Sequence, residues 1–183
     1  MRNILLVSAA AVALAGCNQN SVSLTNASPE EVAKAAKDSG ISFTPGEWET
    51  TVEIVEAEIP GMPKGAADQM MQKGAAKTQK HSYCMSAEEA SHPGAGLLTG
   101  EDQKKSKCTI EKFSMSGGHI EQTVSCPDPD GKVAMRMVTT GNYTPTSMNG
   151  TASMDMDGFM KMKIRANISS RRVGECKPDT PQK

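Results

Sequence analysis

Strict alternation of apolar and polar positions runs through the second half of the chain. Four successive runs show it, and residues typical of turns separate them. Their inward positions are Ile120, Gln122, Val124 and Cys126; Val133, Met135, Met137 and Thr139; Met148, Gly150, Ala152, Met154 and Met156; and Met160, Met162, Ile164, Ala166 and Ile168. Because successive side chains of a strand point to opposite faces, this pattern predicts an antiparallel sheet with one apolar face and one wet face.

The first half adds two strands and short helices. A strand follows Pro45-Gly46, and residues 78–85 read as another. Ser28-Pro29-Glu30-Glu31 is typical of a helix start with a capping box, and a second capping box begins at Ser86. Residues 64–73 are compatible with one more short helix. The fold class predicted is therefore mostly β: an antiparallel meander of about 6–7 strands, either a curved sheet or a partly open barrel, with an N-terminal helix and one or two short helices.

The N-terminal residues have the pattern of an export signal. Arg2 precedes the apolar stretch 4–15, which is too short to span a bilayer. It ends in Leu14-Ala15-Gly16-Cys17, which resembles the lipobox of bacterial lipoproteins. That resemblance implies cleavage before Cys17, attachment of acyl chains such as palmitate, and, with Asn18 next, the periplasmic face of the outer membrane. The alternative is an ordinary signal peptide with a chance cysteine.

These patterns divide the chain into five parts. We expect a lipoprotein signal peptide at 1–16, a lipidated flexible tether at 17–27, an N-terminal helix at 28–40, a disulfide-stapled β domain at 41–177 and a disordered tail at 178–183.

Four cysteines remain once Cys17 is assigned to the lipid. Cys84, Cys108, Cys126 and Cys176 are even in number, and an exported chain lies in an oxidising compartment, so we expect two disulfides. Three connectivities are possible. Pairing of sequence neighbours, Cys84–Cys108 and Cys126–Cys176, is the one we predict. Redox or metal chemistry is the alternative, and the chain contains no Cys-x-x-Cys.

Composition excludes some functions and makes methionine conspicuous. Lys plus Arg is 20 and Asp plus Glu is 21, so nothing indicates nucleic-acid binding. The chain has 13 Met but only 6 aromatic residues. Six of the methionines share the predicted apolar face as i, i+2 pairs: Met135, Met137, Met154, Met156, Met160 and Met162. They fill a core, line a groove for an apolar ligand, or bind Cu(I), which thioethers select.

The remaining candidates favour ordinary surface roles. His81, His92 and His119 are far apart in the sequence. Asp128-x-Asp130-Gly131 and Asp155-x-Asp157-Gly158 resemble a calcium loop without its closing Glu, and read as turns. A basic face, formed by Lys161, Lys163, Arg165, Arg171 and Arg172, is either solvated or in contact with anionic headgroups. We predict no catalytic residue, resident metal or cofactor.

Several motifs together resemble one family. They are Phe43-x-Pro45-Gly46-x-Trp48-Glu49-x-Thr51, Pro60-Gly61-Met62-Pro63, Tyr83-Cys84-Met85-Ser86-x-Glu88 and Arg171-Arg172-Val173-Gly174-Glu175-Cys176. This pattern, from Phe43 to Cys176, resembles the family known as domain of unknown function 3617, found in Gram-negative envelope proteins. The resemblance implies an exported, mostly β, disulfide-bearing domain, often a lipoprotein, with no established activity.

The function expected from the sequence is a non-enzymatic envelope lipoprotein. It would be held to the membrane by its lipid anchor and would contact an envelope protein or the membrane surface, and not nucleic acid. The alternatives are a periplasmic carrier or sensor of an apolar ligand bound in a Met-lined groove, and Cu(I) binding through paired methionines.

Overall fold

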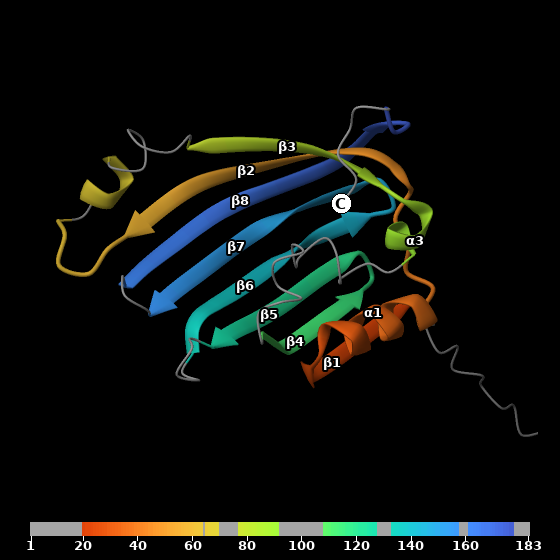
Figure 1. Cartoon of the computed structure of the whole chain (residues 1–183), viewed down its shortest axis with the longest axis horizontal. Helices are drawn as coiled ribbons and strands as arrows, with labels where there is room; N and C mark the ends of the chain where they lie inside the picture. The colour runs from red at the N-terminus through yellow and green to blue at the C-terminus, as the bar shows by residue number, and fades with distance from the viewer. Residues whose placement is uncertain are drawn as a thin grey trace, which may run out of the picture.

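An eight-stranded antiparallel sheet dominates the molecule (Figure 1). The computed structural model describes residues 20–63, 65–69, 77–91, 108–127, 133–157 and 161–177. The strands are β1 (Ser21–Ala27), β2 (Gly46–Glu58), β3 (Thr78–Met85), β4 (Thr109–Ser116), β5 (His119–Pro127), β6 (Val133–Thr144), β7 (Ser147–Asp157) and β8 (Lys161–Gly174); the helices are α1 (Pro29–Asp38) and α3 (Ala87–Ala90). The predicted mostly β meander is confirmed.

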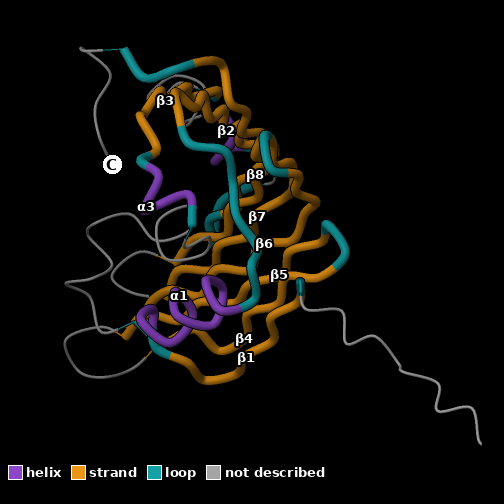
Figure 2. The backbone as a smooth tube through the Cα atoms, turned by 90° about the vertical axis from the view of Figure 1, so that its right-hand side faces the viewer, coloured by secondary structure: helices purple, strands orange, loops and turns teal. Residues whose placement is uncertain are grey.

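The sheet is an open, curved layer. Strands β4 to β8 follow one another as hairpins, β2 and β3 add beside β8, and β1 adds beside β4, which gives the order β1-β4-β5-β6-β7-β8-β2-β3. The described edge strands are therefore β1 and β3. Figure 2 shows the strands curving around α1 and α3, which lie on the concave side. We call this side the inner face and the opposite side the outer face.

Strand β1 corrects the expectation of a flexible tether over 17–27. Residues 21–27 pair antiparallel with β4, with Val22 opposite Met115 and Ala27 opposite Ile110. An edge strand needs apolar side chains on one face only, and the buried Val22 and Ala27 provide them. The sheet thus has eight strands where about 6–7 were predicted. Cys17, the predicted signal peptide and the predicted tail at 178–183 lie outside the described residues.

Both predicted capping boxes are present. The Ser28 hydroxyl accepts from the Glu31 backbone N–H at 3.2 Å, and the Glu31 carboxylate accepts from the Ser28 N–H at 2.8 Å. Ser86 and Glu89 make the same two contacts at the start of α3. Each pair satisfies backbone donors that have no partner within the helix. Residues 66–69 are helical as well, within the helix expected at 64–73.

The compact core lies under α1, at the β1–β4–β5 side of the inner face. Helix α1 packs against β1 and β4. The largest fully buried side chains there include Phe113, Ile110, Met115 and Val32. The core continues to Trp48, Phe43 and Met85 beside α3. This part of the sheet therefore has the packing of an ordinary protein interior.

The two disulfides are Cys84–Cys176 and Cys108–Cys126, so the predicted pairing of sequence neighbours is wrong. Cys108 immediately precedes β4, and the β4–β5 hairpin brings it opposite Cys126, with the Cα atoms 4.1 Å apart. Cys84 on β3 and Gly174 on β8 both pair with Glu47 of the strand between them, so Cys176 needs only two more residues to reach Cys84. Strand register, and not sequence separation, decides the pairing.

Candidate functional site

The predicted methionine face exists, and the sheet register aligns it across three strands. Met135 on β6 lies opposite Met156 on β7, which lies opposite Met162 on β8. One row further along, Met137 lies opposite Met154. Directly opposite residues of antiparallel strands share a face, with Cβ atoms about 4.5–5.5 Å apart. These five methionines therefore form one patch on the inner face, and Met160 lies outside the described residues.

This patch differs from the core in how much it is covered. Met115, Met148 and Met85 are buried, with 0%, 5% and 3% of their surface exposed. The five methionines of the patch are only half-buried. Figure 1 shows α1 over the β1–β4–β5 side and α3 beside the end of β3, so neither lies in front of the patch.

Other apolar side chains extend the patch across the sheet. Ile164 lies opposite Ala57, Ala166 opposite Ile54, and Ile168 opposite Val52, which continues the rows from β8 onto β2. Most of these side chains are likewise half-buried. We call the inner positions of β6, β7, β8 and β2 the open face; they are Met135, Met137, Thr139, Gly141, Gly150, Ala152, Met154, Met156, Met162, Ile164, Ala166, Ile168, Val52, Ile54 and Ala57.

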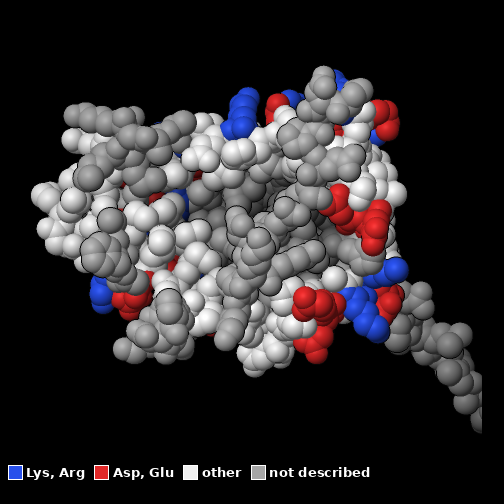
Figure 3. All heavy atoms as spheres, in the orientation of Figure 1, with Lys and Arg blue, Asp and Glu red and all other residues white. Residues whose placement is uncertain are grey.

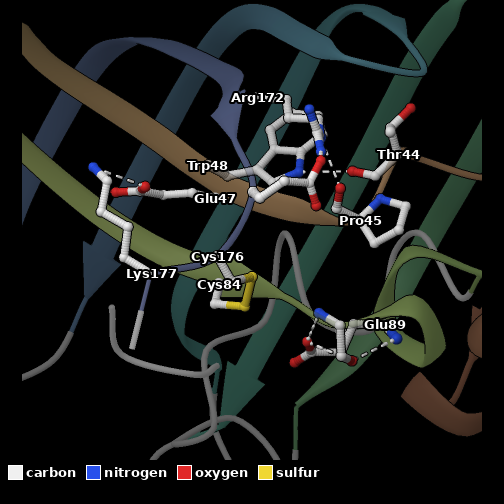
Figure 4. The surroundings of a disulfide bond; sticks show 11 residues. Thr44, Pro45, Glu47, Trp48, Cys84, Glu89, Arg172, Cys176 and Lys177 are labelled. Atoms are coloured by element: carbon white, nitrogen blue, oxygen red, sulfur yellow. Dashed lines mark hydrogen bonds and ion pairs between the residues drawn. A yellow bond between two sulfur atoms is a disulfide. The ribbon is translucent and has the colours of Figure 1, made fainter. Parts of the chain in front are cut away.

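A rigid cluster closes the end of the sheet near α3 (Figure 4). Trp48 is fully buried, donates from Nε1 to the Thr44 carbonyl at 3.0 Å and packs edge-to-face on Phe43. Arg172 donates to the Pro45 carbonyl at 2.7 Å, and the Cys84–Cys176 disulfide lies beside this cluster. These contacts pack and cross-link the end of the sheet near α3.

Burial at the same end raises the pKa values of two tyrosines, Tyr83 and Tyr143. Tyr83 on β3 lies opposite Trp48. Burial raises the pKa of Tyr83 to about 12. The phenol is therefore neutral at physiological pH.

The predicted basic face is electrically balanced. Lys163 pairs with Asp155 at 3.6 Å, Arg165 with Glu56 at 3.2 Å and Arg171 with Glu49 at 3.1 Å, all on the outer face. Lys161 pairs with Asp157, and Arg172 with Glu175. Each of the five predicted basic residues thus has an acidic neighbour within this chain, which weakens its attraction to anionic headgroups.

The outer face also has a shallow depression of about 570 Å³, lined by the end of β4, the start of β5 and the neighbouring parts of β6 and β7. Ser114, Glu121, Asn142 and Asn149 are among the residues that line it. It forms where Gly141 faces Gly150 across β6 and β7. Of the residues that line it, Glu121 alone carries a carboxylate.

The remaining sequence candidates do not come together. His81 and His119 are exposed on β3 and β5, far apart in the strand order, and His92 lies outside the described residues. Asp155 and Asp157 are in ion pairs on β7, and 128–130 is not described. Among the described residues no group of three or more His, Cys, Asp or Glu could hold a metal ion, and no helix is long and apolar enough to cross a membrane.

Gln122 is an inner residue whose environment the sequence pattern does not indicate. Gln122 belongs to the predicted inward alternation of β5, and it is 1% exposed. The only sign of this in the sequence is a polar residue within an apolar run. The alternation does not indicate whether its amide has a hydrogen-bond partner.

Charged side chains are scarce at the inner positions of the described strands. Figure 3 shows this side of the molecule, with described Lys, Arg, Asp and Glu visible along its upper, right and lower margins. The inner strand positions carry a single permanent cation among the described residues, Arg172, at the closed end. The open face is therefore suited to an apolar, uncharged surface.

Comparison with known proteins gives one match. A family model described as "Protein of unknown function (DUF3617)" matches residues 43–176, which run from Phe43 before β2 to Cys176 after β8 and include all four disulfide cysteines. No curated protein matches the chain, and no solved structure matches it.

Proposed function

The chain belongs to this family of unknown function, and we propose from its geometry that it binds the acyl chain of a lipid on the open face. The observation that carries the proposal is the contrast in burial on one side of one sheet. Aliphatic and methionine side chains are buried under α1, whereas most of the larger ones across β6, β7, β8 and β2 are half-buried, with Met148, Ala57 and Ala166 buried. A contiguous apolar surface that stays partly accessible is suited to binding an apolar partner.

The dimensions of the open face match an acyl chain. Met135 to Gly141 covers six residue steps along β6, or about 20 Å at roughly 3.4 Å per step. Across β6, β7, β8 and β2 the width is about 14 Å, at roughly 4.8 Å per strand spacing. One leaflet of a bilayer has a hydrocarbon depth of about 15 Å. A single chain can therefore lie along the strands.

The side chains favour a flexible apolar occupant over a protein. Protein interfaces are anchored by Trp, Tyr and Arg, and the open face has none of these. Methionine is unbranched and adapts its shape to a mobile partner. The expectation of a membrane-surface contact through the basic residues loses support, because those residues are paired within the chain.

Export and lipid anchoring form part of the proposal. The Leu14–Cys17 lipobox and the two disulfides both support an oxidising envelope compartment. An acyl anchor on Cys17 would hold the open face beside a source of lipid. Intact mass measurement of the mature protein tests this, because it should begin at an acylated Cys17. A mature protein that still begins at Met1 would contradict it.

Native mass spectrometry of the Cys17→Ser chain, which lacks the proposed anchor, tests the binding. We expect it to retain single-chain lipid added during purification. Ala152→Lys places a charge on the open face and should abolish retention. Thr151→Lys is the matched control, because Thr151 is the next residue of β7, is exposed and points to the outer face. Equal retention by all three proteins, or by none, would contradict the proposal.

Cu(I) binding is a second candidate function, favoured by one observation. Met135, Met156 and Met162 stand in a single register row, so three thioethers can approach one another. Thioether ligands select Cu(I). Competition with bathocuproine should then show a Cu(I) complex that Met156→Leu, the central substitution, removes. An unchanged competition curve would exclude this row as a copper site.

A further inference from the structure

We propose that Gln122 forms the polar end of this site, and that the ligand is a single-chain lipid with an uncharged hydrogen-bonding head group, such as a monoacylglycerol. The inference rests on the proposed acyl-binding function and adds the head group to it. It starts from a separate observation, namely a buried carboxamide that finds no partner among the described residues.

Gln122 lies in the middle of β5 with its side chain on the inner face. It is opposite Phe113 of β4 on one side and Thr139 of β6 on the other. Its side chain is 1% exposed, and Phe113 and Thr139 are also buried. The position is therefore where the core under α1 meets the open face.

Neither polar atom of this side chain has a hydrogen-bond partner among the described residues. Nε2 and Oε1 are both buried and both unbonded. Buried amides are nearly always paired, since removing them from water is costly. A leucine would fill the position at no such cost, so the amide requires another explanation.

The register row of Gln122 leads directly onto the open face. Thr139, Ala152 and Ala166 follow it across β6, β7 and β8. These side chains are small, Thr139 and Ala166 are buried, and Ala152 is half-buried. Met137 is the diagonal neighbour of Gln122, with Cβ atoms about 7–8 Å apart. A chain lying on the Met137–Met154 row can thus bring its head group within reach of the carboxamide.

The chemistry of the carboxamide specifies the head group. Its N–H groups can donate to an ester carbonyl, and its oxygen can accept from a hydroxyl. A carboxylate or phosphate would need a cation. Arg172, the one permanent cation at the described inner strand positions, is bonded to the Pro45 carbonyl and to Glu175. An uncharged ester with a free hydroxyl satisfies both halves of the amide without a buried charge.

The test compares monopalmitoylglycerol and palmitic acid at pH 8 on the Cys17→Ser chain and on the same chain carrying Gln122→Leu. We expect the parent to prefer the uncharged ester. Gln122→Leu should weaken ester binding about tenfold, the equivalent of losing one to two hydrogen bonds. The ligand-free variant should unfold at the same or a higher temperature. Gln69→Leu, at an exposed glutamine outside the sheet, is the matched control and should leave both measurements unchanged.

A spectroscopic measurement on the parent keeps the inference testable if the variant does not fold. The infrared carbonyl band of ¹³C-labelled ester should shift to the hydrogen-bonded position on binding. If the ester binds but Gln122→Leu binds it equally well, or the band stays at its apolar position, the head-group inference is wrong and acyl binding stands. If neither lipid binds the parent, the proposed function itself fails.

Discussion

The two disulfides should contribute unequally to stability, because they close loops of very different length. Cys84–Cys176 joins residues 92 apart, and Cys108–Cys126 joins residues 18 apart. The chain-entropy relation gives about 4.6 kcal/mol for the long loop and about 3.2 kcal/mol for the short one. Removing the long-range bond should therefore cost about 1.4 kcal/mol more, roughly a tenfold larger change in the unfolding equilibrium.

Urea unfolding of two double variants measures this difference. Cys84→Ala/Cys176→Ala should have the lower midpoint, and Cys108→Ala/Cys126→Ala the higher one, at similar m values. Both should contain no free thiol under denaturing conditions, apart from Cys17, because each loses a whole bond. The long-range bond also ties the C-terminal end of β8 to β3 across β2, so its loss frees the end near Trp48.

A crossed variant provides the control for the pairing. Cys84→Ala/Cys108→Ala removes one partner from each bond and should leave two alkylatable thiols, Cys126 and Cys176. If this variant showed no free thiol and unfolded like a protein with one native disulfide, the pairing would be wrong. If the two single-bond variants unfolded in the opposite order, the loop-length reasoning would be refuted.

Two other predictions concern the strand pair at the centre of the sheet and the buried tyrosine. Gly141→Ala should destabilise the protein by about 1–3 kcal/mol in thermal unfolding, because its Cβ would lie 2.4 Å from the Asn149 carbonyl oxygen. Gly174→Ala, whose Cβ would meet nothing within 4 Å, is the control, and equal effects would refute the steric explanation. Tyr83, with its pKa raised to about 12 from an ordinary value of 10, should remain protonated in the folded state after it has ionised in the unfolded chain. The native protein then holds more protons, so stability falls as pH rises from 10 to about 12. Ultraviolet titration at 295 nm, alongside Tyr83→Phe, checks this; a phenol titrating near 10 would contradict it.

The sheet could be predicted because the information that specifies it is local. Alternation with a period of two in residues 120–168 indicates strands, and it indicates which side chains share a face. The helix starts at Ser28 and Ser86 were equally readable, since a capping box lies within four residues.

Edge pairing and disulfide pairing could not be read in the same way. The segment Ser21–Ala27 is mostly polar, and its strand character depends on the neighbouring β4, about ninety residues further along the chain. The disulfides depend on which strands are adjacent: Cys84 reaches Cys176 only because β2 lies between β3 and β8. The pairing of β1 and the disulfide connectivity both depend on which distant strands lie side by side and in which register. The local sequence pattern does not indicate this.

The sequence predicts which residues share the apolar face of the candidate site, but not which part of that face is covered. The sequence placed Met135, Met137, Met154, Met156 and Met162 on one face, and the structure confirms that arrangement. Which part of that face is covered depends on where α1 and α3 pack. The unsatisfied amide of Gln122 likewise becomes visible only when its neighbours Phe113 and Thr139 are in place.

Methionine-methyl NMR tests the central claim most directly. In the Cys17→Ser chain labelled with ¹³C at the methionine methyl groups, titration with monopalmitoylglycerol should shift the signals of the open face: Met135, Met137, Met154, Met156 and Met162. The buried Met85 and Met115 should move little, because they lie in the packed core. Saturable shifts confined to the open-face methionines would support acyl binding there. Shifts of the core methionines alone, or no shifts at any lipid concentration, would contradict it.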